Sequence, residues 1–467
     1  MTRYLLLALM LIAAPAIAVD ELPVGVRNAL QVRQVPADTL SIHVEDLETG
    51  EVVLAWNAEV QRNPASTMKL LTTLVARAIL GPAYRWKTDG FARGEIRDGQ
   101  LDGDLLLKGY GDPFLVTERV WQMLRRLRLE GVHEISGDLL LDDSWFDVGD
   151  YDPADFDNQP LRAYNVAPNA LLLNFKVVRY WFAPNGNRVS VVVDPPLHNL
   201  RVDNRLTVRQ GYCGGYQRGI AVHMNDANDT VIFEGRFPSG CERYAMDRTA
   251  LSHNEFAFGL LHSVWTESGG VFPATWKPAL AGEDEEPLFT FQSPTLSELI
   301  ARINKHSNNV MTRQVLYTLA AEVNGPPGTE SGGRDVIAAW LEDNDMESCA
   351  VALENGAGLS RESRICATAM ASMLRFAWQQ PYMPEFVASM SLSGLDGTLR
   401  RRFKDSELVG QAHMKTGSLD HVAAIAGYMQ SRSGRRFAVV AMQNHEDIHR
   451  GPGEEVQEAL LRWLYDL

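Results

Sequence analysis

The stretch Asn63-Pro64-Ala65-Ser66-Thr67-Met68-Lys69 decides how this chain is interpreted, because Ser66 is its only serine with a lysine three residues later. Two further fragments follow along the chain, Ser307-Asn308-Asn309 and Lys415-Thr416-Gly417. Active-site serine acyltransferases carry Ser-x-x-Lys, Ser-x-Asn and Lys-Thr-Gly fragments in this order. The ordered trio predicts a serine nucleophile and a fold that brings three distant parts of the chain together.

A serine hydroxyl is a poor nucleophile at neutral pH and needs a base within hydrogen-bond reach. The apolar run after Pro64 predicts a largely buried helix, so that Ser66 and Lys69 lie on one face. A free lysine has a pKa of ~10.4 and is a cation. Burial and a second nearby cation both favour the neutral amine, and Lys415 is the cation that we expect.

The second fragment predicts two further roles. The hydroxyl of Ser307 can relay a proton from Lys69 to the leaving nitrogen, and the amide of Asn309 can hold a peptide bond of the substrate. In isolation this fragment is equally typical of an ordinary helix cap before Val310.

The third fragment lies at the end of a predicted strand. Lys415 supplies positive charge for a substrate carboxylate, with the hydroxyl of Thr416 beside it. Gly417 allows close backbone approach if the substrate pairs along the strand. The backbone N–H groups of Ser66 and Ser418 are the expected oxyanion hole.

Each fragment alone carries little weight. A Ser-x-x-Lys arises by chance on the order of once or twice in a chain of this size, and an exposed serine with a solvated lysine is the alternative. The stretch Ser252-His253-Asn254 repeats the spacing of the second fragment. We set it aside because it lies in a β-rich region and no helical pattern follows it.

The periodicity of the chain predicts an α/β (α+β) core. Residues 40–45 and 52–56 predict a hairpin. Helical patterns follow residue 295 and include residues 335–341 and 368–378, whereas residues 413–417, 423–429 and 437–442 predict strands. Residues 454–467 predict a closing amphipathic helix. We expect the first hairpin and the last three strands to share one antiparallel sheet.

Between these ends the pattern changes. Short strand-like runs alternate with Gly, Asp, Asn and Pro clusters, with little helical pattern, which predicts a mostly β insertion of one or two small domains. The acidic run Glu283-Asp284-Glu285-Glu286 marks its expected end. The predicted domains are residues 19–84 with 283–467, and the insertion 85–282.

The first residues predict export. Arg3 precedes an apolar run over residues 4–13 and the small-residue site Ala16-Ile17-Ala18, as in a signal peptide of residues 1–18. A buried N-terminal helix is the alternative. No later stretch approaches the ~20 apolar residues of a transmembrane helix, so we expect an exported chain without a membrane span.

The cysteines fit an oxidising compartment. There are four, Cys213, Cys241, Cys349 and Cys366, and four cysteines allow three pairings. Proximity in sequence favours Cys213–Cys241 and Cys349–Cys366. A metal site is the alternative, but no Cys-x-x-Cys and no His-Glu-x-x-His is present, so disulfides are favoured.

Composition excludes other classes. The 467 residues carry a formal net charge of −15, which argues against nucleic acid as a partner. A P-loop, a Gly-x-Gly-x-x-Gly fingerprint and a Gly-x-Ser-x-Gly elbow are all missing. We expect neither a metal nor a cofactor.

Further stretches extend the pattern over nearly the whole chain after the signal peptide. They are Gly109-Tyr110-Gly111-Asp112-Pro113, Gly137-Asp138-Leu139, Asp142-Asp143-Ser144, Tyr164-Asn165-Val166-Ala167-Pro168-Asn169-Ala170-Leu171, Asn355-Gly356-Ala357-Gly358-Leu359-Ser360-Arg361 and Gly394-Leu395-Asp396-Gly397-Thr398-Leu399. With the three fragments they resemble the penicillin-binding proteins. More narrowly, the chain is similar to the D-alanyl-D-alanine carboxypeptidase/endopeptidase family with a large insertion between the first two motifs.

The resemblance implies a β-lactamase/DD-transpeptidase-like domain and a periplasmic serine peptidase. It implies Ser66 as nucleophile, Lys69 as base, Ser307 as proton relay, Asn309 as amide-binding residue and Lys415 as carboxylate-binding and charge-tuning residue. The implied substrates are muropeptides that end in D-Ala-D-Ala or carry D-Ala cross-links. β-Lactam antibiotics are the implied acylating inhibitors of Ser66.

Asn355 and Ala357 stand where that family usually has Asp and Ser. A β-lactamase is the first alternative, but such enzymes lack nearly two hundred residues between these motifs. A non-catalytic scaffold or sensor that binds muropeptides is the second, and a sensor would usually need a membrane span. The sequence leaves the oligomeric state and the balance of carboxypeptidase and endopeptidase activity open.

Overall fold

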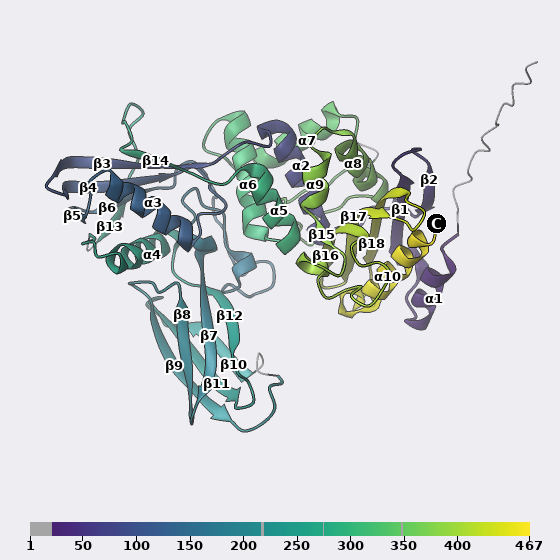
Figure 1. Cartoon of the computed structure of the whole chain (residues 1–467), viewed down its shortest axis with the longest axis horizontal. Coiled ribbons are helices and arrows are strands. Elements are labelled where there is room, and N and C mark those ends of the chain that lie inside the picture. The colour runs from purple at the N-terminus through teal and green to yellow at the C-terminus, as the bar shows by residue number, and fades with distance from the viewer. Residues whose placement is uncertain (1–20, 216–218, 274, 347–348) are drawn as a thin grey trace, which may run out of the picture.

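The computed structural model describes residues 21–215, 219–273, 275–346 and 349–467 (Figure 1). The predicted signal peptide, residues 1–18, lies outside the described residues. In the described part of the chain the strands form three six-stranded sheets. The first sheet is built from the two ends of the chain, and the other two from the part between them.

The first sheet joins the chain ends. Its strands, in the spatial order β15-β16-β17-β18-β1-β2, are Ser391–Leu392, Ala412–Leu419, Val422–Gln430, Arg436–Asn444, Leu40–Asp46 and Val52–Trp56. Every neighbouring pair in this order is antiparallel. The expectation that the first hairpin and the last three strands share one antiparallel sheet is therefore confirmed.

Helices cover both faces of this sheet, because side chains along a strand point alternately to its two faces. In β17, Ala424 and Ala426 pack with one group of helices, whereas Ile425 and Met429 pack with the other. The first group is α2 Lys69–Leu80, α5 Leu296–His306, α6 Asn309–Asn324, α7 Glu330–Asp343, α8 Ala367–Gln379 and α9 Met383–Ala388. The second is α1 Val24–Val32 and α10 Pro452–Tyr465. Helix α2 lies inside the first group, with residues 69–77 all buried.

The inserted part contains the other two sheets (Figure 1). One has the order β13-β6-β4-β3-β14, with β5 beside β4, and the other has the order β10-β11-β9-β8-β7-β12. The strands of the former are β3 Lys87–Arg97, β4 Gln100–Gly109, β5 Glu134–Ile135, β6 Leu139–Asp142, β13 Trp276–Pro278 and β14 Phe289–Gln292. Those of the latter are β7 Val177–Asn185, β8 Arg188–Asp194, β9 Arg201–Arg209, β10 Ile220–Met224, β11 Thr230–Pro238 and β12 Tyr244–Thr249.

The insertion is mostly β, as expected, but it also contains two helices that the sequence pattern did not predict. Helices α3 Thr117–Leu129 and α4 His253–Glu267 pack in the same core as the two inserted sheets. Helix α4 carries no amphipathic period because it is buried on most sides, from Phe256 to Leu261 without a break. Ser252 caps this helix in a capping box with Glu255, so the claim that no helix follows Ser252-His253-Asn254 is wrong.

Strand β14 follows the acidic run that was expected to end the insertion, yet it pairs with β3. The inserted sheet therefore continues to Gln292. The domain limits drawn from the sequence stay a prediction.

Two disulfides are present, Cys213–Cys241 and Cys349–Cys366, in the pairing that proximity favoured. The first joins the segments that follow β9 and β11, and the second ends at the N-cap of α8. Among the described residues, no helix has the length and apolar character needed to cross a membrane.

Candidate active site

Ser66 lies in a short 3₁₀ turn, Ala65–Met68, that leads directly into α2. Lys69 is the first residue of α2, one turn after Ser66, so the two side chains are stacked on the same side. The Lys69 Nζ and Ser66 Oγ atoms are 2.9 Å apart. The pair therefore meets the distance that proton transfer from hydroxyl to amine requires.

The amine of Lys69 is fully buried and has two further partners. Its Nζ donates to Asn309 Oδ1 and to the backbone oxygen of Ala357, each at 2.5 Å. A neutral amine has two N–H groups and one lone pair. Because two oxygens take the N–H groups, the lone pair is left for the hydroxyl of Ser66.

Burial and neighbouring charges favour the neutral form of this amine. Burial, followed by the positive charges of Lys415 and Arg313, holds the pKa of Lys69 well below that of a free lysine. Arg313 is itself buried on α6, where its Nη1 donates to Tyr151 Oη and to the Val166 carbonyl at 2.7 and 3.0 Å. The candidate base Lys69 thus has two basic side chains beside it, Lys415 and Arg313.

The second lysine holds the other side of the site. Lys415 is buried in β16, and its Nζ donates to Ser307 Oγ at 2.9 Å and to the Thr416 carbonyl at 2.7 Å. Burial lowers the pKa of Lys415 to about 7. The Thr416 hydroxyl lies 2.8 Å from that of Thr398, and together they form a polar edge beside Lys415.

The turn between α5 and α6 presents one side chain to each lysine. Ser307 ends α5 in the left-handed conformation, at φ 55°, and Asn308 caps α6 by accepting from Met311 N–H. This turn directs Ser307 to Lys415 and Asn309 to Lys69. The predicted helix cap is present and is made by Asn308, whereas the neighbouring Ser307 and Asn309 contact the two lysines.

Gly417 brings β16 against the start of α2. A Cβ atom at this position would lie 2.5 Å from the Pro64 carbonyl oxygen and 3.1 Å from Ser66 N. Only glycine permits this approach. It favours the expected oxyanion hole of the Ser66 and Ser418 N–H groups, which stays a prediction.

The loop with Asn355 and Ala357 forms the floor beside Lys69. The Asn355 side chain accepts from Ala357 N–H and donates to the Leu359 carbonyl, which fixes the loop. Gly358, at φ 70°, has no room for a Cβ atom, which would lie 1.9 Å from the Ala65 carbonyl oxygen. Since Lys69 contacts the backbone oxygen of Ala357, the side chain at 357 does not decide that contact.

The structure thus brings together Ser66, Lys69, Ser307, Asn309, Lys415, Thr416 and Gly417 from three distant fragments, with the exposed Ser418 at the edge. Sequence reasoning missed Ala357, Arg313 and Thr398 as contributors. Ala357 and Thr398 both lie in stretches that carried the resemblance, so a signal was present for them. Arg313, a buried arginine within a helix, gives no comparable signal.

Replacing Ser307 by alanine tests the proton relay. We expect Ser307→Ala to lower kcat by about 10²-fold, at the lower end of the contribution of general acid–base catalysis. Ser252→Ala is the matched control, because it removes a helix cap of the same sequence spacing at a cost of about 1 kcal/mol of stability. Steady-state kinetics with the D-Ala-D-Ala peptide that the resemblance implies as substrate measures both. Equal kcat values for the two variants would argue against a role of Ser307.

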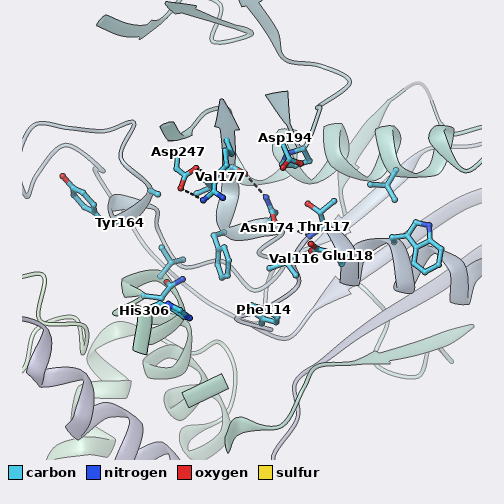
Figure 2. A pocket seen from close by; sticks show the side chains of 18 of the residues that line it. Phe114, Val116, Thr117, Glu118, Tyr164, Asn174, Val177, Asp194, Asp247 and His306 are labelled. Atoms are coloured by element: carbon cyan, nitrogen blue, oxygen red, sulfur yellow. Dashed lines mark hydrogen bonds and ion pairs between the residues drawn. The ribbon is translucent and has the colours of Figure 1, made fainter. Parts of the chain in front are cut away.

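A large cavity adjoins this site. It has a volume of about 1100 Å³ and lies between the α5–α6 turn, the start of α3 and the inserted strands β7 and β12. Figure 2 shows His306 of the turn and Phe114, with Thr117, Asn174 and Asp247 contributed by the insertion. Ser307 and Asn309 belong to its wall, so the cavity opens beside the reactive groups.

Comparisons with known proteins identify the family of the chain. Residues 25–467 match the model of the D-Ala-D-Ala carboxypeptidase 3 (S13) family. A D-alanyl-D-alanine carboxypeptidase of Actinomadura sp. (strain R39) is 28% identical over 453 residues, which cover 89% of this chain and 79% of the relative. The D-alanyl-D-alanine carboxypeptidase DacB of Haemophilus influenzae is 24% identical over 410 residues, covering 86% and 84%.

Solved structures support the fold. The crystal structure of penicillin binding protein 4 (dacB) from Haemophilus influenzae superposes with a TM-score of 0.80 at 22% identity, covering 95% of this chain and 100% of that one. The predatory endopeptidase Bd0816 of Bdellovibrio bacteriovorus gives a TM-score of 0.54 at 14% identity, covering 91% and 92%. The predicted fold class and the predicted family resemblance are therefore confirmed.

Proposed function

The chain belongs to the D-Ala-D-Ala carboxypeptidase 3 (S13) family of serine-type peptidases, and we propose that it hydrolyses the amide after a D-alanine of peptidoglycan peptides through an acyl-enzyme at Ser66. The observation that carries this proposal is the contact of 2.9 Å between Ser66 Oγ and a buried Lys69 amine. Substrates would be peptides that end in D-Ala-D-Ala, D-Ala cross-links, or both.

In the proposed acylation, Lys69 Nζ takes the proton of the Ser66 hydroxyl while Oγ attacks the carbonyl carbon of the D-alanine. The oxyanion is expected to accept from the backbone N–H groups of Ser66 and Ser418. The C–N bond then breaks, and the leaving nitrogen receives the proton that Lys69 took up, with Ser307, whose hydroxyl contacts Lys415 in the structure, as the expected relay. The product amine leaves and an ester to Ser66 remains.

Deacylation repeats these steps with water. Lys69 takes a proton from the water, whose oxygen attacks the ester carbonyl, and the released Ser66 oxygen regains the proton. The cation of Lys415 and the hydroxyls of Thr416 and Thr398 are suited to hold the carboxylate next to the scissile amide. A β-lactam would acylate Ser66 by the same attack, but its leaving group stays attached and obstructs water.

We also propose that the protein acts in the periplasm. The charged, apolar and small-residue order of residues 3–18 supports export. The two disulfides agree with an oxidising compartment.

A digest of purified muropeptides tests the choice of bond. We expect the enzyme to release D-alanine from disaccharide-pentapeptide monomers and to convert D-Ala cross-linked dimers into monomers, because its site recognises the D-Ala amide and leaves space beside it. Chromatography with mass spectrometry identifies the products. Loss of terminal D-alanine alone would restrict the activity to a carboxypeptidase, and the absence of both products would contradict the proposed function.

A further inference from the structure

The cavity beside the α5–α6 turn is not used by the chemistry described above. Its volume of about 1100 Å³ exceeds the ~300–1,000 Å³ of ordinary small-molecule pockets. A terminal D-alanine needs only a small part of this space. We propose that the cavity binds the N-acetylated disaccharide of a muropeptide whose peptide occupies the active site, an inference that rests on the proposed function.

The position of the cavity supports this occupant. The turn that delivers Ser307 to Lys415 and Asn309 to Lys69 is also one wall of the cavity. Ser307 and Asn309 therefore border both the two lysines of the site and the cavity. The part of a muropeptide that continues from the stem peptide is its sugar.

The opposite wall is suited to a sugar. Glu118, Trp121 and Gln122 lie on one face of α3 at helical spacing, and the Trp121 side chain is 49% exposed although it is a large apolar residue. An aromatic ring can cover the apolar face of a pyranose, while carboxylate and amide groups can bind its hydroxyls. Apolar walls with a few placed polar groups are typical of a ligand site.

The wall formed by β7 and β12 also contributes polar and aromatic groups. Arg179 and Asp247 form a bidentate pair, with Nε–Oδ1 and Nη2–Oδ2 distances of 2.7 and 2.9 Å, and Asn174 lies beside them (Figure 2). Phe175 and Phe114 line the side toward the active site, with ring centroids 6.1 Å apart. Asn174 already donates to the Val177 carbonyl and accepts from Thr117 N–H, so this wall offers hydroxyl and acetamido groups the remaining N–H groups and lone pairs of Asn174, Arg179 and Asp247.

The charge of the cavity excludes a polyanion as occupant. Its wall contains the carboxylates of Glu118, Asp194, Asp247 and Glu267, against the guanidinium of Arg179. A phosphate-rich polymer would be repelled. The disaccharide of a muropeptide carries no charge, because the lactyl carboxyl is consumed in the amide bond to the peptide.

Trp121→Ala tests the proposal in the full-length enzyme. The substrates are a disaccharide-pentapeptide and the same pentapeptide with an acetylated N-terminus and no sugar. For the disaccharide substrate we expect kcat/KM to fall about tenfold through KM, as for the loss of one aromatic contact. For the bare peptide, and for acylation by penicillin, we expect changes of less than about twofold, within the scatter of surface substitutions.

Leu129→Ala is the matched control. Leu129 is 67% exposed on the same helix α3 but does not line the cavity, so its removal should affect neither substrate. Equal use of both substrates by the wild-type enzyme, or equal effects of Trp121→Ala on both, would overturn the sugar site. If the wild-type enzyme hydrolyses neither substrate and resists penicillin, the proposed function itself fails.

Discussion

Replacing Ser66 by alanine should abolish peptide hydrolysis, with kcat lowered by about 10⁴-fold or more, as for other nucleophiles in covalent catalysis. The physical reason is that, among the residues the structure describes, Ser66 has the only hydroxyl in contact with Lys69, whose two N–H groups are taken by Asn309 and Ala357. Release of D-alanine from a pentapeptide measures the loss. The substitution removes one oxygen from a half-buried side chain, so the fold should persist.

Circular dichroism and the unfolding midpoint provide the control for Ser66→Ala. Thr67→Ser is a matched variant, since Thr67 is the neighbouring hydroxyl and its Oγ1 donates to the Pro64 carbonyl instead of Lys69. A folded Ser66→Ala enzyme that keeps more than about a tenth of the wild-type kcat would have lost too little catalysis for Ser66 to be the nucleophile. That result would reject Ser66 as nucleophile.

Replacing Lys69 by methionine should lower kcat/KM by about 10²–10⁴-fold, the contribution of a general base. Methionine is similar in length to lysine but cannot accept a proton. Burial penalises the amine, but Lys69→Met also leaves Asn309 Oδ1 and the Ala357 carbonyl without their donor, so we expect a folded variant with a lowered unfolding midpoint. A folded, inactive variant would separate catalysis from folding.

The pH dependence of kcat/KM provides a second test of Lys69 as the base. The amine acts as base only when neutral, and its pKa lies well below that of a free lysine because of burial and the charges of Lys415 and Arg313. The wild-type kcat/KM should therefore be retained at neutral pH and fall as the pH drops through this lowered pKa. The residual rate of Lys69→Met should lack that acid limb. A wild-type profile that rises only near pH ~10 would show an ordinary lysine and refute the assignment.

The sequence was sufficient where the signals are local. The ordered fragments around Ser66, Ser307 and Lys415 marked the site, and the strand periods at both chain ends predicted the shared sheet. Alternation along a strand depends on neighbouring residues only, so it can be read without the fold.

Prediction from the sequence failed where the burial of a helix, a backbone contact or a distant charge determines the structure. Helix α4 is buried on most sides, so its apolar residues show no helical period, and the prediction of a mostly β insertion did not include it. The Ala357 contact to Lys69 uses a carbonyl that every residue type possesses. The positive charge of Arg313 on α6 lowers the pKa of Lys69, and no spacing of residues in the sequence indicates this interaction.

Mapping the penicillin adduct tests the acyl-enzyme most directly. Trypsin cleavage after Arg62 and Lys69 gives a peptide of residues 63–69, which contains Ser66. Mass spectrometry of the penicillin-treated enzyme should find one adduct per chain, carried by Ser66 in this peptide, and none in Ser66→Ala. An adduct on another residue, or inhibition by penicillin with Ser66 unmodified, would contradict the account.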